Sequence, residues 1–100
     1  MQVTRQEIIA DESKAILDLK LSNQETQSAA QVGQVLAAYA ATIQPPWGLM
    51  VGIVINGYTN EIHDKNRGKG VNVYVHYFIG PSPKRPLQGP SVESVEITPQ

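Results

Sequence analysis

Apolar and polar residues alternate between Leu17 and Leu21, and Ala15 continues the apolar positions of this pattern. The odd-numbered positions of this segment are all Ala or Leu, whereas Asp18 and Lys20 occupy even-numbered positions. A period of two is typical of a strand with one buried face. We therefore predict a strand over this segment.

The residues before this strand allow two interpretations. Thr4 and Glu7 have the spacing of a capping box, which favours a helix, whereas residues 11–14 have the composition of a hairpin turn. A single helix running through both segments would place the leucines on opposite faces. We therefore prefer a hairpin of two strands, with its turn at residues 11–14.

A helix is predicted after Asn23, a residue type that often caps helix N-termini. From there apolar residues recur every three or four positions, as expected for one buried stripe: Ala29, Val32, Val35, Leu36, Tyr39 and Ile43. The helix must end before Pro45, because proline restricts the residue before it and cannot donate a backbone hydrogen bond. Its many alanines favour close packing on a sheet or against a second copy of the helix.

A second, longer hairpin is predicted from Leu49 to Ile79. Two segments rich in β-branched residues, 49–62 and 71–79, flank a polar loop that contains Gly68 and Gly70. With the turn near residue 66, one face of this hairpin is continuously apolar. The other face gathers Asn and aromatic side chains, and Val54 lies near Phe78 on it.

These elements predict an α+β fold. An antiparallel sheet, built from the N-terminal hairpin and the long C-terminal hairpin, carries one Ala-rich helix on one face. Residues 1–80 form the single domain, and residues 81–100 form a Pro-rich basic linker and a C-terminal tail that either adds an edge strand or hangs free.

Composition narrows the class of protein. With 41% hydrophobic residues the chain is not disordered throughout, and its net charge of -1 excludes a histone-like protein. The absence of Cys removes disulfides and thiolate metal sites, and we expect neither a metal nor a cofactor. Neither a signal peptide nor an apolar run of membrane-spanning length is present, so we expect a cytoplasmic protein without a membrane partner.

The small net charge hides an asymmetry. Residues 1–64 hold seven acids and three bases, whereas residues 65–100 hold five bases and two acids. No acid lies between Lys65 and Ser91, so the hairpin tip and the tail form one positive region.

The polar face of the predicted long hairpin is the main candidate site. Its flat rings and amides suit stacking and hydrogen bonding to a nucleobase, and its members are Asn56, Tyr58, Asn72, Tyr74, His76 and Phe78. Cations at the hairpin tip, Lys65, Arg67 and Lys69, could hold phosphates. The sequence therefore favours a small, non-enzymatic, oligomeric protein that binds a nucleotide or single-stranded nucleic acid.

Two other functions remain open. The protein could be a structural or assembly subunit, such as a virion or complex component, whose Asn/aromatic face forms a homo-oligomer interface through Val54 and Phe78. It could also be a metal-independent nuclease that uses His63 and His76.

Overall fold

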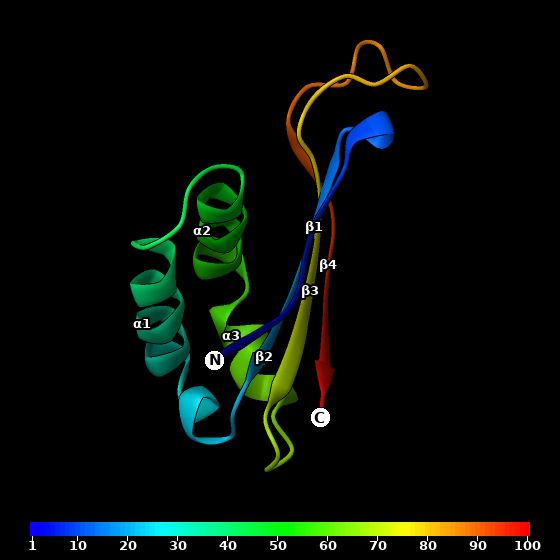
Figure 1. Ribbon diagram of the computed structural model, residues 1–100. Coiled ribbons are helices and arrows are strands. Elements are labelled where there is room, and N and C mark those ends of the chain that lie inside the picture. The colour runs from blue at the N-terminus through cyan, green and yellow to red at the C-terminus, as the bar shows by residue number, and fades with distance from the viewer.

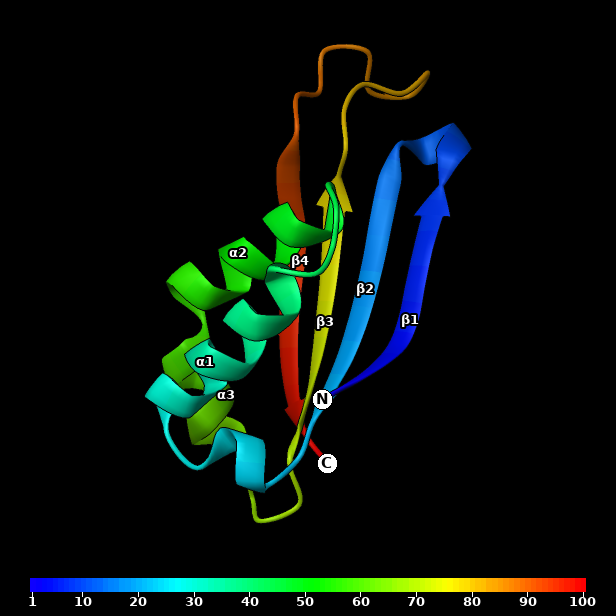
Figure 2. The ribbon, with the colours of Figure 1, turned by 60° about the vertical axis from the view of Figure 1, so that its left-hand side comes forward.

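The fold is described from a computed structural model of residues 1–100, and its centre is one antiparallel sheet. The strands are β1 (Gln2–Ile9), β2 (Lys14–Leu21), β3 (Val71–Phe78) and β4 (Ser91–Pro99). They lie side by side in the order β1-β2-β3-β4 (Figure 2). The chain as a whole is elongated, with principal extents of 43 × 24 × 21 Å.

All three helices lie between β2 and β3 in the sequence and on the same side of the sheet (Figures 1 and 2). They are α1 (Ala29–Ala40), α2 (Trp47–Gly57) and α3 (Thr59–Lys65). The predicted α+β class with one covered sheet face is therefore confirmed. The single helix of the prediction is wrong, because two further helices complete the layer. None of the three has the length and apolar character needed to cross a bilayer.

The N-terminal hairpin forms as predicted. β1 pairs with β2 in antiparallel register, and Ile8 lies opposite Ala15. The turn contains a short 3-10 helix, η1 (Ala10–Glu12), and Ser13 follows it with a φ of 50° in the left-handed region. On β2, the odd-numbered Ala and Leu side chains are buried, as their alternation predicts.

The first helix starts later than its sequence suggested. Asn23 precedes a short 3-10 turn, η2 (Gln24–Thr26), and the true N-cap of α1 is Ser28. The Ser28 hydroxyl accepts a hydrogen bond of 3.1 Å from the backbone N–H of Gln31. The helix ends at Ala40, before the two prolines, and Val32 and Leu36 are buried in the core.

The predicted strand over residues 49–62 is wrong, because this segment forms α2 and α3. Its buried side chains recur at helical spacing, and they are Met50, Val51, Val54 and Ile62. The β-branched residues of the segment favour strands in general, but burial of one helical stripe outweighs that propensity. The long hairpin of the prediction therefore does not exist, and β3 pairs with β2 and β4 instead.

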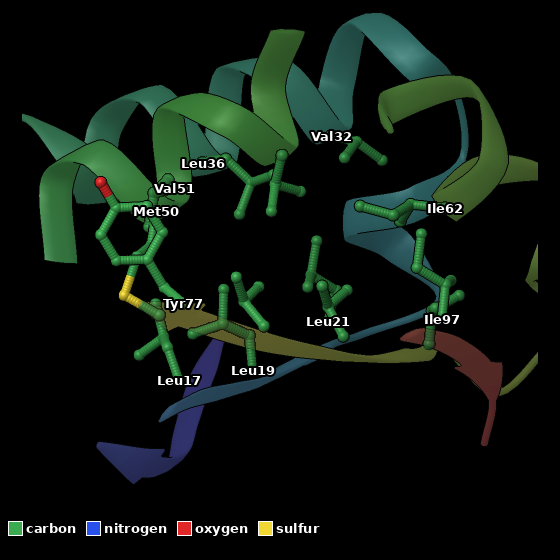
Figure 3. Packing of buried hydrophobic residues seen from close by; sticks show 14 of the residues in the cluster. Leu17, Leu19, Leu21, Val32, Leu36, Met50, Val51, Ile62, Tyr77 and Ile97 are labelled. Atoms are coloured by element: carbon green, nitrogen blue, oxygen red, sulfur yellow. The ribbon is translucent and has the colours of Figure 1, made fainter. Parts of the chain in front are cut away.

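The core lies between the helices and the covered face of the sheet (Figure 3). Leu17, Leu19 and Leu21 of β2 meet Leu36 of α1 and Met50 of α2, and all are at most 1% exposed. Full burial of each such side chain contributes about 1.5–3 kcal/mol. Because the helices pack on this face, the opposite face of the sheet remains uncovered.

The segment after residue 80 provides the fourth strand. Of the two alternatives for the tail, an edge strand is the one observed, as β4. The preceding loop, residues 79–90, projects beside the β1–β2 turn at the far end of the sheet (Figure 1). The Ser13 hydroxyl donates to the carbonyl of Pro81 at 2.7 Å, and Arg85 donates to the carbonyl of Glu12. These contacts join the two turns.

Candidate functional site

The face of the sheet opposite the helices, here called the open face, carries polar and aromatic side chains. β3 places four residues there at alternate positions: Asn72, Tyr74, His76 and Phe78. Their neighbours on β2 are Lys20, Asp18, Ile16 and Lys14. Their neighbours on β4 are Thr98, Glu96, Ser94 and Ser91. The predicted Asn/aromatic face therefore exists in part, on one central strand.

Two residues expected on that face lie elsewhere. Asn56 is exposed on α2, and Tyr58 packs against the core between α2 and α3. Both belong to the helical layer on the other side of the sheet, because residues 49–62 are helical. They do not join Asn72 and Tyr74 in one site.

Tyr74 lies between two carboxylates. The register places Asp18 opposite Tyr74 on one side and Glu96 opposite it on the other. The Oδ1 atom of Asp18 is buried and has no hydrogen-bond partner in the protein. Burial raises the pKa of the Asp18 carboxyl, and the neighbouring charges of Arg5 and His76 offset part of this effect. Of the two carboxylates, the exposed one of Glu96 is therefore the hydrogen-bond acceptor that a ligand beside the Tyr74 ring can reach.

The basic loop follows α3 and is held in a defined conformation. The side-chain oxygen of Asn66 accepts hydrogen bonds from the N–H groups of Gly68 and Gly70, at 2.9 and 3.1 Å. Both glycines have a φ of 95°, which other residues adopt only with strain. A Cβ atom at Gly70 would also overlap the carbonyl oxygen of Leu21. The position of Lys69, between the two glycines, is fixed by this arrangement.

The three cations of the loop differ in their surroundings. Lys65 is the last residue of α3 and is exposed. The guanidinium of Arg67 donates to the carbonyl of Asp64 at 2.7 Å, so it is partly engaged within the loop. Lys69 forms no ion pair and lines a polar cavity of about 340 Å³.

This cavity, here called the Lys20–Lys69 pocket, lies where the basic loop meets the open face. Its lining consists of Met1, Gln2, Lys20, Ser22, Asn23, Glu25, Lys69 and Gln100. Gln2 and Lys20 are paired on adjacent strands, so the pocket adjoins one end of the open face. Glu25 is occupied by the N-terminal ammonium and by the N–H of Ser22. The ammonium groups of Lys20 and Lys69 are left without a carboxylate partner.

Lys20 was not among the residues singled out from the sequence. Its position on the polar side of β2 follows from the alternation of residues 15–21. Its proximity to Lys69 does not, because the pocket depends on β2 lying next to β3. The sequence pattern did not predict this pairing, because it indicated a long hairpin of residues 71–79 with residues 49–62.

At the opposite end of the open face, two cations lie over the ring of Phe78. One comes from the loop of residues 79–90 and the other from β2. The guanidinium carbon of Arg85 lies 4.1 Å from the centroid of the Phe78 ring, and Lys14 lies 5.7 Å from it. Lys14 also forms a 2.7 Å ion pair with Glu93. The single positive region expected for hairpin tip and tail is thus wrong, because Lys69 and Arg85 occupy opposite ends of the sheet (Figure 1).

Two further residues are separated from the open face. Val54, expected at an interface beside Phe78, is fully buried on α2 and belongs to the core. His63 lies on α3, where its Nδ1 is 2.8 Å from the carbonyl oxygen of Thr26, whereas His76 lies on the open face. The two histidines therefore do not meet within one chain.

Chemically, the arrangement combines two features at one end of the open face. Two unpaired ammonium groups can bind an anion, and a tyrosine ring flanked by carboxylates can bind a flat group that carries hydrogen-bond donors. Comparison with known proteins gave no match to any family model, curated protein or solved structure.

Proposed function

We propose that this protein is a non-enzymatic binding protein for a nucleotide. The observation that carries the proposal is that Lys20 of the sheet and Lys69 of the basic loop line one polar pocket, next to the open face that bears Tyr74. Phosphate occupies the pocket, and the base stacks on the Tyr74 ring.

In the Lys20–Lys69 pocket, phosphate binding depends on the charge of the two lysines and on the backbone conformation of the basic loop. Neither lysine is neutralised by a carboxylate, so both ammonium groups are available to phosphate oxygens. Each charge-assisted hydrogen bond of this kind contributes about 1.5–3 kcal/mol. The fixed conformation of the loop around Gly68 and Gly70 reduces the entropy lost when Lys69 binds.

The base end relies on stacking and on hydrogen-bond acceptors. Tyr74 is the diagonal neighbour of Lys20 across two adjacent strands, and such neighbours are about 7–8 Å apart. Stacking of one base on an aromatic ring contributes about 1–3 kcal/mol. The exposed carboxylate of Glu96, beside Tyr74, can accept hydrogen bonds from amino groups of the base. This favours adenine, guanine and cytosine over uracil.

The charge distribution favours a single nucleotide over a long strand. The cations at the open face are Arg5, Lys14, Lys20 and Arg85, and the acids are Glu7, Asp18, Glu93 and Glu96. Affinity for nucleic acid strands depends on a net positive surface that offsets the backbone phosphates. A strand extended along the face would pass its phosphates over the acids, whereas one nucleotide would not.

The test is calorimetric titration of the protein with AMP, GMP, CMP and UMP at low and high salt. We expect the first three to bind more tightly than UMP, with affinity that falls as salt rises. Replacing Lys20 and Lys69 together with Ala is expected to weaken binding at least tenfold. Lys84→Ala removes the same charge at the other end of the sheet, and should leave binding unchanged. Unchanged affinity in the double variant, or no binding to the wild type, would refute the proposal.

Assembly through the open face has less support as a function. Of its two expected interface residues, Val54 is inside the core and the ring of Phe78 is covered by Arg85. A nuclease that uses His63 and His76 together has no support within one chain, since they lie on different sides of the sheet.

A further inference from the structure

The outer edge of β1 is the most exposed regular segment of the protein. Seven of its eight residues are exposed, and the helical layer leaves this strand uncovered (Figure 2). It carries two large apolar side chains, Val3 and Ile8, that are 37% and 47% exposed. An edge of this kind offers unpaired backbone N–H and C=O groups to another strand.

β1 carries one positive and one negative side chain at equal distances from Gln6, so two antiparallel copies of β1 can pair opposite charges. Arg5 and Glu7 lie on the open face, opposite Asp18 and Ile16 respectively, with Gln6 between them. Within one chain they form an ion pair of 2.7 Å, and their side chains are 46% and 48% exposed. In an antiparallel pair of β1 strands centred on Gln6, each Arg5 would lie opposite the partner's Glu7.

Other registers are disfavoured by charge or by side-chain direction. Centring the pair on Arg5 places two guanidinium groups opposite each other, and centring it on Glu7 places two carboxylates together. A shift of one residue would set open-face side chains against those of the helix side. Of these registers, the one centred on Gln6 satisfies both conditions, and on the helix side it sets Ile8 opposite the partner's Thr4.

From this complementarity we propose that two copies of the chain pair antiparallel through β1, centred on Gln6, to form one continuous sheet. The occupant of the β1 edge is therefore a second copy of the same protein. This inference is independent of nucleotide binding, because Tyr74 and Lys69 lie on or next to β3, away from the outer edge of β1.

The other edge of the sheet is not self-complementary. β4 carries the acids Glu93 and Glu96 and no base, and Pro90 and Pro99 lie at its two ends. Pairing of two β4 strands would bring like charges together and would lack donors at the prolines. Self-association is therefore expected at β1 alone.

The pairing should be weak. The irregularity between Val3 and Arg5 limits regular pairing to the central part of β1. An interface of two short strands buries much less than the roughly 1,600 Å² of a typical stable complex. We expect a reversible dimer in the micromolar range of dissociation constants.

The test is a charge exchange followed by sedimentation velocity over a concentration series. We expect Arg5→Glu and Glu7→Arg, each alone, to raise the dimer dissociation constant at least tenfold. An equal mixture of the two variants should restore the dimer, because each Glu then lies opposite an Arg. The chain with both substitutions should also dimerise, since it only exchanges the two charges.

Glu96→Arg on β4 is the matched control and should leave the dimer unchanged. Circular dichroism establishes that each variant is folded, which is expected because both side chains are about half exposed. A wild type that stays monomeric at the highest concentrations would overturn the proposal. So would single variants that dimerise like the wild type, or a mixture of them that does not associate.

Discussion

The guanidinium of Arg85 lies over the ring of Phe78, 4.1 Å from its centroid, and also donates to the carbonyl of Glu12. One side chain of the Pro-rich loop thus contacts both the end of β3 and the turn between β1 and β2. The loop is attached to the sheet at this point, although its Pro-rich sequence predicts an extended linker.

Arg85→Ala is expected to loosen this end of the molecule. The variant loses a cation–π contact and a charged hydrogen bond, together about 2–4 kcal/mol of folding free energy. Urea unfolding measures the loss, and amide hydrogen exchange should rise in residues 79–90. Lys84→Ala, next to it and exposed, is the control and should change neither quantity.

Substitutions at the two glycines of the basic loop separate backbone strain from steric overlap. Gly68 and Gly70 share a φ of 95°, but a Cβ atom at Gly68 meets open space, whereas one at Gly70 overlaps the carbonyl of Leu21. We expect Gly68→Ala to cost about 1–2 kcal/mol of stability and Gly70→Ala clearly more. Thermal unfolding of both variants checks this. Equal losses would mean that the overlap has no energetic weight.

Neighbouring residues of α2 test its helical packing. Met50 is fully buried and Leu49 is 57% exposed. Met50→Ala should reduce the free energy of unfolding by about 2–5 kcal/mol, because it leaves a cavity in the core. Leu49→Ala should reduce it by less than about 0.5 kcal/mol. Chemical denaturation measures both values, and a reversed order would contradict the assignment of this face to the core.

Asp18 should make stability depend on pH in a defined direction. Its folded-state pKa is raised, chiefly by burial, so the ionised carboxylate disfavours the folded state. Asp18→Asn should stabilise the protein, and the gain should appear as pH rises from the ordinary value of 3.8 through the raised pKa. Because Asp18 is only partly buried, we expect under about 1 kcal/mol.

Unfolding at acidic and neutral pH measures this difference, and Asp11→Asn, at an exposed position of the turn, is the control. A gain present at acidic pH and absent at neutral pH would contradict the interpretation.

The sequence predicted those elements whose pattern is local. The alternation on β2 and the Ala-rich stripe of α1 each reflect burial of one face, and both are present. The prediction of a strand over residues 49–62 was wrong because Val and Ile favour strands locally. In the structure this segment is helical, and its buried side chains cover the sheet. The failed strand also misplaced Asn56, Tyr58 and Val54.

The sequence correctly placed Asn72, Tyr74, His76 and Phe78 on one face, because alternation within a single strand needs no partner. Lys20 and the carboxylates around Tyr74 could not be found in this way. Their proximity comes from the pairing of β3 with β2 and β4, and residues far apart in the chain determine that pairing.

The order of the strands has a consequence for how the chain reaches this structure. Every strand is paired with its neighbour in the sequence, so the sheet is a meander interrupted once, by the helical residues between β2 and β3. The β1–β2 hairpin closes over a short turn and can form early. Joining β2 to β3 must close a loop of residues 22–70, and the entropy of that closure is offset only when the helices dock. Helix docking and completion of the sheet should therefore occur as one cooperative, rate-limiting step.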